Sequence, residues 1–304
     1  MKHIYFSIIV LSLLVFYTGC KKNCSVSPDA SLKVNATNSL RIAAVGDSVI
    51  LTGSSTAANA SYLWRAVEGP SIPTIGNDTA LVTYATHFAV AGNYVFQLQA
   101  TNTAGVVGLD TTNIIVAKTL TAYTVGGSGQ ERNFSELDDT DYSSSGTSEL
   151  LAMAWTGGGY PYFNRSTFEF NLDSLPATAT IVSAKLTLYS DSTPLNGDHL
   201  GDANSGINNS MYIERVTSNW NTSDTWFTQP SIDQSSSILI PATNLPQLDL
   251  VDVDVTDMLQ KMQTDGRYGF ELRLEDEVNP TIRDFCSGQY SQTYRHPKLV
   301  INYY

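Results

Sequence analysis

Three aromatic side chains surround a glycine-rich turn near the middle of the chain. Trp155 precedes the turn, and Tyr160 and Tyr162 follow the glycines at 157–159. One face of a pyranose ring is apolar and stacks on an aromatic ring, and binding residues concentrate on loops held by a rigid scaffold. We therefore predict that Trp155, Tyr160 and Tyr162 form a sugar-binding platform. The alternative is a hairpin whose aromatic side chains cover the edge of the core.

Basic side chains late in the chain offer a second kind of contact. A guanidinium pairs with a carboxylate through parallel hydrogen bonds, so arginines beside the platform would select an acidic sugar. We assign this role to Arg283 and Arg295, which belong to a basic group that also contains Arg273 and Lys298. Arg165 is interpreted instead as the structural ion-pair partner of a loop carboxylate.

An acidic segment near residue 140 is the place where a cation would be sought. The oxygen atoms of its carboxylates are the ligands that Ca²⁺ prefers, but their spacing is not that of an EF-hand. We therefore prefer a solvated acidic loop and expect no cofactor, with Ca²⁺ as the weaker alternative. The residues concerned are Glu136, Asp138, Asp139 and Asp141.

Catalytic groups are sparse in the sequence. The four histidines are scattered and none has the spacing of a metal-ligand pair. His296, near Tyr290 and Tyr294, is where the base of a lyase would be sought, yet it directly precedes Pro297 and the last predicted strand. We therefore expect no catalytic residues and no enzyme.

The elements that must hold these side chains are predicted to be β-strands. Between residues 164 and 190, apolar side chains such as Phe168 and Leu186 alternate with polar ones on both sides of Pro176. Successive side chains of a strand point to opposite faces, so two half-buried strands result, and a second sheet must cover them. Helical periodicity is confined to a short segment at 256–262, with Gly266 beyond its end. The sequence predicts an all-β fold.

Residues 40–117 are predicted to form a sandwich of their own. Short strand patterns alternate with turn signals, and Trp64 is expected at the centre of the core with Tyr94 on a facing strand. The motifs are Tyr62-x-Trp64, Gly69-Pro70, Gly92-x-Tyr94-x-Phe96-x-Leu98 and Asn102-x-x-Gly105. In this series the region resembles the polycystic-kidney-disease (PKD) type of immunoglobulin-like domain. The resemblance implies an Ig-like spacer or contact module without a catalytic role.

Residues 119–304 contain about eight strand patterns with long loops at 190–210 and 227–247, which fit a β jelly-roll sandwich. Five blocks follow one another here, at 165–176, 181–189, 215–230, 254–270 and 295–301. In their order and composition they resemble the DNRLRE domain family. That family includes modules grouped as carbohydrate-binding module family 96, some of which bind acidic polysaccharides such as alginate. The resemblance implies non-catalytic glycan binding.

The N-terminus is predicted to be an export signal and an anchor. A basic start and a short apolar run end at Gly19-Cys20, and the sequence before Cys20 resembles a bacterial lipobox. We expect residues 1–19 to be a lipoprotein signal peptide, Cys20 to be lipidated, and residues 20–39 to be a flexible tether. These features predict an outer-membrane lipoprotein of the cell envelope. Its orientation stays open, because Lys21 and Lys22 stand where some surface-exported lipoproteins carry acidic residues.

The charge balance narrows the choice of partner. Lys and Arg number 17 against 29 Asp and Glu, which gives a net charge of −12. Nucleic-acid binding needs a basic face, so no nucleic-acid partner is expected. Our leading expectation is a membrane-anchored protein that binds extracellular polysaccharide. A structural or adhesive envelope protein is the first alternative, and a polysaccharide-degrading enzyme is the second.

Overall fold

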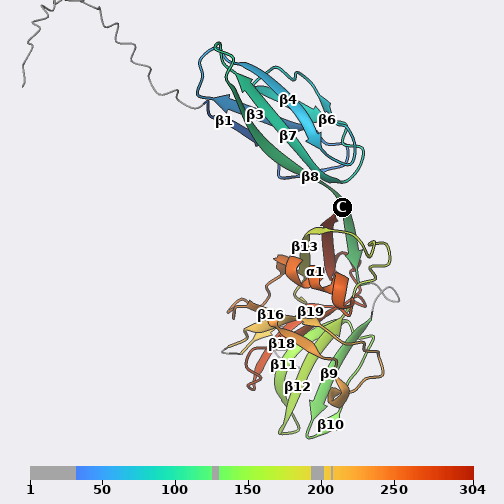
Figure 1. The fold of residues 1–304 in the computed structure, drawn as a ribbon. Coiled ribbons are helices and arrows are strands. Elements are labelled where there is room, and N and C mark those ends of the chain that lie inside the picture. Colours follow the sequence, from blue (N-terminus) through green and yellow to red (C-terminus); the bar gives the residue numbers. More distant parts are fainter. Residues whose placement is uncertain (1–31, 125–129, 193–201, 207) are drawn as a thin grey trace, which may run out of the picture.

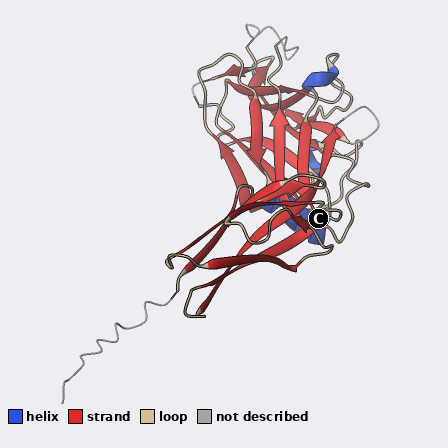
Figure 2. Cartoon of the chain, turned by 90° about the horizontal axis from the view of Figure 1, so that it is seen from above, coloured by secondary structure: helices blue, strands red, loops and turns tan. Residues whose placement is uncertain are grey.

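The computed structural model describes residues 32–124, 130–192, 202–206 and 208–304. Two β-sandwiches follow one another along the chain, and helices are limited to short segments (Figures 1 and 2). The predicted all-β fold, an Ig-like sandwich followed by a jelly-roll-like sandwich, is confirmed. The predicted signal peptide, Cys20 and most of the tether lie outside the described residues. In the described part of the chain, no helix has the length and apolar character needed to cross a bilayer.

The first sandwich encloses a core of aromatic and aliphatic side chains around Trp64. Trp64 and Tyr94 are both buried, as predicted, but they lie on neighbouring strands of one sheet and not on facing strands. The sandwich begins at Val34, so the end of the segment assigned to the tether is a strand. One sheet has the order β1 (Val34–Asn38), β3 (Val49–Ser55), β6 (Val82–Thr86) and β5 (Thr74–Ile75), and the other contains β4 (Ser61–Glu68), β7 (Gly92–Thr101), β8 (Val107–Tyr123) and the short parallel strand β2 (Ile42–Ala44).

The second sandwich is built on two sheets. The smaller face is formed by β17 (Leu250–Asp254), β13 (Ile181–Leu188), β20 (Lys298–Tyr303) and the end of β8. The larger, curled sheet contains β14 (Asn204–Ser205), β19 (Thr281–Cys286), β11 (Glu149–Gly157), β12 (Tyr160–Phe168), β18 (Phe270–Leu274), β15 (Met211–Val216) and β16 (Ile232–Ile240), with β9 (Glu131–Leu137) and β10 (Thr140–Asp141) beside β12.

The alternating pattern of residues 164–190 is realised in part: residues 181–188 form β13 as predicted, but β12 ends at Phe168, so Phe170 and Leu172 reach the core from the segment after the strand. Phe168, Leu186 and Leu188 are buried between the sheets, in one continuous core. The predicted helix is α1 (Thr256–Asp265), which adds Met258 and Leu259 to that core. Two short 3-10 helices, η1 (Trp226–Thr228) and η2 (Thr293–Arg295), lie in the loops.

A single strand passes from one sandwich into the other. β8 is 17 residues long and pairs with β7 over residues 107–116 and with β20 over residues 118–123. The boundary predicted between residues 117 and 119 therefore lies within a continuous strand, and Figure 1 shows β8 running down into the second domain. The two domains share this strand and are not joined by a loop.

Candidate functional site

The three predicted aromatic residues lie together on the β11–β12 hairpin. Trp155 and Tyr162 are directly opposite one another in the register, and Tyr160 pairs with Gly157 at the turn. The two turn residues, Gly158 and Gly159, have φ of +59° and +94°. Such a two-residue turn matches the twist of the strands and is accessible to glycine without strain. The glycines thus explain why the flanking aromatic side chains are brought side by side.

The hairpin aromatics rest on a small apolar cluster that is separate from the main core. Trp155 and Tyr162 are half-buried and pack against Leu151, Met153 and Ile282. Leu150, Ala152 and Ala154 alternate with the cluster residues along β11 and are buried in the main core. Successive side chains of a strand point to opposite faces, so the cluster lies on the outer face of the sheet. Tyr160 at the turn is 53% exposed. The rings cover apolar side chains, as the alternative interpretation expected, and they keep exposed surface; sugar binding by this surface stays a prediction.

Arg283 does not contribute to this surface, because it is buried. It is fully buried on β19, opposite Ala152 of the main core, and therefore faces the interior of the sandwich. Its Nη1 donates to the carbonyls of Asn209 (3.4 Å) and Pro241 (3.2 Å), while burial lowers the pKa of its guanidinium to about 10. In this position Arg283 has no exposed atom to offer a ligand. We leave it out of the proposed site.

Arg295 is the last residue of η2 and is held by contacts with other loop segments of the domain. Its Nη2 donates to the carbonyl of Ser190 and lies 3.9 Å from a carboxylate oxygen of Asp249. It also contacts the buried thiol of Cys286, whose pKa is raised to about 12, first by burial and then by the nearby carboxylate of Asp191. These contacts are structural. The five residues predicted as one site thus separate into three hairpin aromatics and two arginines that lie elsewhere.

The acidic loop at 136–141 forms a tight hairpin turn. Asp138 and Asp139 have positive φ, and the backbone N–H of Asp139 donates to Oε1 of Glu136 at 2.6 Å. Asp141 accepts hydrogen bonds from the hydroxyl of Ser143 (2.5 Å) and from the N–H of Trp226 (2.8 Å). These carboxylates hold the turn and fix the start of η1. They are not arranged around a common point.

A different set of carboxylates does converge. Oxygen atoms of Glu149, Asp191 and Asp284 lie within 4.8 Å of one another, and all three residues are buried. Asp191 and Asp284 are on adjacent segments, since the N–H of Asp191 donates to the carbonyl of Asp284. Carboxylate oxygens are the ligands of Ca²⁺, so this set offers the chemistry of a cation site. No local motif predicts this cluster, because the three residues are far apart in the chain.

The other tryptophans of the domain are structural supports. Trp220 is buried and its Nε1 donates to the carbonyl of Tyr268 at 2.8 Å. Trp226 lies over β12, 4.8 Å from the guanidinium of Arg165. Arg165 in turn forms two hydrogen bonds to the carboxylate of Glu277, at 2.7 and 2.8 Å. The interpretation of Arg165 as the partner of a loop carboxylate is thereby confirmed.

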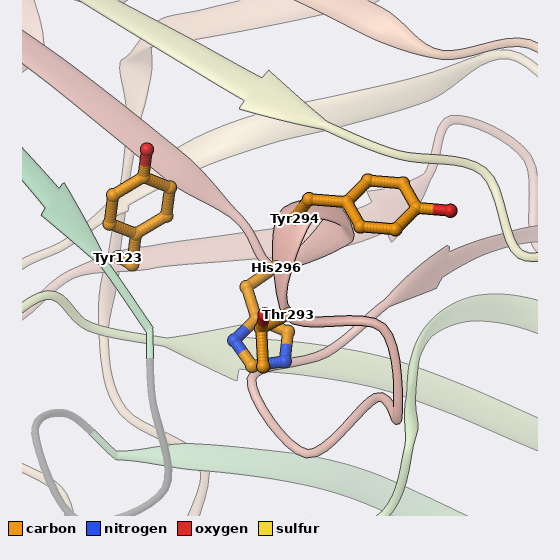
Figure 3. A pocket seen from close by; sticks show the side chains of 4 residues that line it. All are labelled: Tyr123, Thr293, Tyr294 and His296. Atoms are coloured by element: carbon orange, nitrogen blue, oxygen red, sulfur yellow. The ribbon is translucent and has the colours of Figure 1, made fainter.

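A cavity of about 350 Å³ opens beside the end of β8 and is lined by Tyr123, Thr293, Tyr294 and His296 (Figure 3). Tyr123 and Tyr294 are 41% and 70% exposed, whereas His296 is buried. In Figure 3 the hydroxyl of Tyr294 points away from His296, so the two side chains do not form an acid–base pair. His296 and Tyr294 are close in the sequence, whereas Tyr123 is distant in the chain and is brought to the cavity only by the fold.

Comparisons with known proteins agree with the architecture. A family model described as carbohydrate-binding module family 96 matches residues 122–303, and one described as K319L-like, PKD domain, matches residues 36–116. No curated protein matches the chain.

Two solved structures illustrate how distant the structural similarities are. One comes from work on the promiscuous specificity of carbohydrate-binding modules of the β-sandwich superfamily. It is 11% identical with a TM-score of 0.37, over 90% of this chain and 98% of that chain. The other is SGBP-B of the Bacteroides ovatus mixed-linkage glucan utilization locus in complex with a heptasaccharide. It is 10% identical with a TM-score of 0.17, over 85% and 72% of the two chains.

The family assignment rests on the sequence match to the second domain. That match covers nearly all of the second sandwich, including the β11–β12 hairpin, and more than half of the 304-residue chain. The chain therefore belongs to carbohydrate-binding module family 96, with a PKD-like domain before the module.

Proposed function

We propose that this protein is a non-catalytic polysaccharide-binding lipoprotein of the cell envelope, and that the β11–β12 hairpin contacts the glycan. The observation that carries the proposal is the cross-strand pair of Trp155 and Tyr162, presented on the outer face of a module that belongs to a carbohydrate-binding family. Tyr160, exposed at the turn, extends the same aromatic surface.

The hairpin favours contact with sugar faces through ring stacking. Aromatic side chains bring large apolar area with few rotatable bonds, so little conformational entropy is lost when a pyranose stacks on them. The turn is tight and its strands are paired on both sides, which keeps the rings in place before the ligand arrives. Neither Arg283 nor Arg295 reaches this surface, so stacking and hydrogen bonding must supply the affinity there.

Non-catalytic binding is tested by measuring polysaccharide binding and polysaccharide cleavage on the same protein. The full chain is run through gels that contain neutral or acidic polysaccharides, and the same polysaccharides are then assayed for new reducing ends and unsaturated products. We expect retarded migration on at least one polysaccharide and no products. Formation of products would assign the protein to an enzyme class, and migration unaffected by any polysaccharide would favour the structural or adhesive alternative.

The membrane anchor is proposed from the lipobox-like sequence that ends at Cys20. Each buried methylene of an acyl chain contributes about 0.8 kcal/mol, so several chains on one cysteine hold a protein on a bilayer. Metabolic labelling with a palmitate analogue should mark the wild-type protein and not Cys20→Ser. Cys24→Ser, four residues further on, is the matched control and should remain labelled. Equal labelling of all three proteins would contradict the anchor.

A further inference from the structure

Two cavities flank the end of strand β8, on a part of the domain that the hairpin does not reach. The first is the cavity of Figure 3, with Tyr123 and Tyr294 at its mouth. The second, of about 130 Å³, is lined by Thr124 and residues from four other segments. Tyr123 and Thr124 are consecutive in the chain, so the cavities adjoin the same backbone. In Figure 1 this strand ends in the part of the module nearer the PKD-like domain, whereas the β11–β12 turn lies at the far end.

The first cavity combines exposed rings with a hydroxyl group. Tyr123 and Tyr294 come from β8 and η2 and keep 41% and 70% of their surface exposed. Figure 3 shows their rings on different sides of the cavity, with Thr293 and His296 between them. Exposed aromatic rings with hydroxyl groups nearby are the groups that stack on a pyranose and bind its hydroxyls.

The floor of the first cavity has a defined hydrogen-bonding state. Nε2 of His296 lies 2.8 Å from the carbonyl of Tyr290. A carbonyl oxygen only accepts, so Nε2 must carry the hydrogen, and in the neutral imidazole Nδ1 is then an acceptor. An acceptor on the floor of a tyrosine-flanked cavity suits a sugar hydroxyl.

The second cavity adds amide and hydroxyl groups and one carboxyl. Glu131 accepts from the N–H of Gly288 at 2.8 Å, and burial raises its pKa. Among the described residues, neither lining contains Lys or Arg, but the guanidinium of Arg132 donates to the hydroxyl of Ser145 and to the carbonyl of Thr222, two residues of the second lining. A carboxylated sugar would therefore meet the Glu131 carboxyl and a guanidinium that already has partners, whereas a neutral sugar would meet complementary hydrogen-bonding groups. The uncharged lining residues with polar side chains are Thr124, Gln130, Ser145, Thr222 and Gln289.

We propose that the two cavities beside Tyr123 and Thr124 form a second carbohydrate-binding site, which takes a neutral sugar chain. The ring of one sugar unit stacks on Tyr123 or Tyr294, and its neighbours in the chain hydrogen-bond along the second cavity. The inference rests on the proposed function for the class of ligand, and it adds a site that is independent of the hairpin. Two sites on one module let it hold two segments of a polysaccharide at once and raise its avidity.

The test is a titration of the full chain with cellohexaose, mannohexaose and a hexamer of mannuronate as probes. Four proteins are compared: wild type, Tyr123→Ala/Tyr294→Ala, Trp155→Ala/Tyr162→Ala, and the quadruple variant. Tyr84→Ala is the control, since Tyr84 is an exposed tyrosine of the PKD-like domain. Tyr123→Phe/Tyr294→Phe keeps the rings and removes only the hydroxyls. Thermal melting confirms that each variant is folded.

We expect Trp155→Ala/Tyr162→Ala to bind a neutral hexasaccharide more weakly than wild type but still measurably, through the second site, and the quadruple variant to bind at least about tenfold more weakly than this double variant. The Phe variants should keep most of the affinity, and the mannuronate hexamer should not bind at this site. An unchanged affinity and stoichiometry in folded Tyr123→Ala/Tyr294→Ala would overturn the second site and leave the proposed function intact. A wild-type protein that binds only the mannuronate hexamer would also overturn it, again without loss of the proposed function.

Discussion

Trp155 and Tyr162 face each other across the β11–β12 hairpin, and the same two rings cover the apolar side chains of Leu151, Met153 and Ile282. This dual contact makes a specific prediction. Trp155→Ala and Tyr162→Ala should each weaken glycan binding by about five- to fiftyfold, which corresponds to about 1–2 kcal/mol of lost ring contact. Each should also lower the free energy of unfolding by about 1–3 kcal/mol, because an apolar cluster loses its cover.

Calorimetric titration with a bound oligosaccharide, together with urea unfolding, measures both effects. Tyr160→Ala separates them, because its exposed ring should contribute to affinity but little to stability. Tyr84→Ala should change neither quantity. Affinity that stays at the wild-type level in folded Trp155→Ala would place the binding surface away from the hairpin.

Arg283 makes a prediction of the opposite kind. Its guanidinium is buried, its Nε and Nη2 have no hydrogen-bond partner in the described part of the chain, and burial lowers its pKa to about 10. A buried charge without a paired carboxylate costs free energy of desolvation, so Arg283→Met should leave the free energy of unfolding within about 1 kcal/mol of wild type or raise it. Glycan binding should be unchanged. Lost binding in a variant of unaltered stability would show that Arg283 does contact the ligand.

Glu271 predicts a pH dependence of stability. It is buried on β18 beside Arg165 and Glu214, and burial raises its pKa from an ordinary value of 4.5 to about 7. The folded protein therefore holds a proton that the unfolded chain releases between about pH 4.5 and 7. The contribution of Glu271 to the free energy of unfolding is fully present below pH 4.5. It is lost as the pH rises to 7, which lowers the free energy of unfolding by up to about 3 kcal/mol.

Glu271→Gln is the matched variant, since the amide imitates the protonated carboxyl. Urea unfolding of both proteins should give similar stabilities at pH 5, with the variant becoming the more stable of the two by pH 8. Parallel stability curves from pH 5 to 8 would contradict a raised pKa for Glu271.

The shared strand β8 predicts that the two domains keep a fixed relative orientation. Insertion of Gly-Gly-Ser-Gly after Ala117 should interrupt the strand between its pairings with β7 and β20 and let the domains move. Small-angle scattering should then show a larger radius of gyration and a broader distance distribution. The same insertion after Ala104, in the β7–β8 turn, is the control and should leave both unchanged. An equal response to the two insertions would contradict the rigid junction.

Local patterns were enough to predict the strands but not how they continue. The alternation through Phe168 and Leu186 fixed two strands and their buried faces, since period-two patterning follows directly from strand geometry. The sequence pattern did not predict that β8 is continuous, because Lys118 and Thr119 interrupt the apolar pattern where the strand passes between two cores. A boundary drawn from composition falls naturally at such a point.

The site was predictable where it is local in sequence. Trp155, Tyr160 and Tyr162 are near neighbours in the chain, and a glycine turn between them is sufficient to bring them together. The carboxylates of Glu149, Asp191 and Asp284, and the pairing of Tyr123 with Tyr294, depend on which strands become neighbours. Arg283 shows the reverse case, because an arginine in a strand does not reveal from its type alone which face it occupies.

The central claim is that the intact chain binds polysaccharide through the hairpin aromatics. The most direct measurement is a glycan array that spans neutral and acidic polysaccharides, probed with the wild-type chain and with Trp155→Ala/Tyr162→Ala at equal concentration. We expect clear retention of the wild type on at least one polysaccharide and a marked loss of signal for the variant. Absence of wild-type retention on every neutral and acidic glycan, with the protein folded, would show that the chain does not bind polysaccharide through this hairpin.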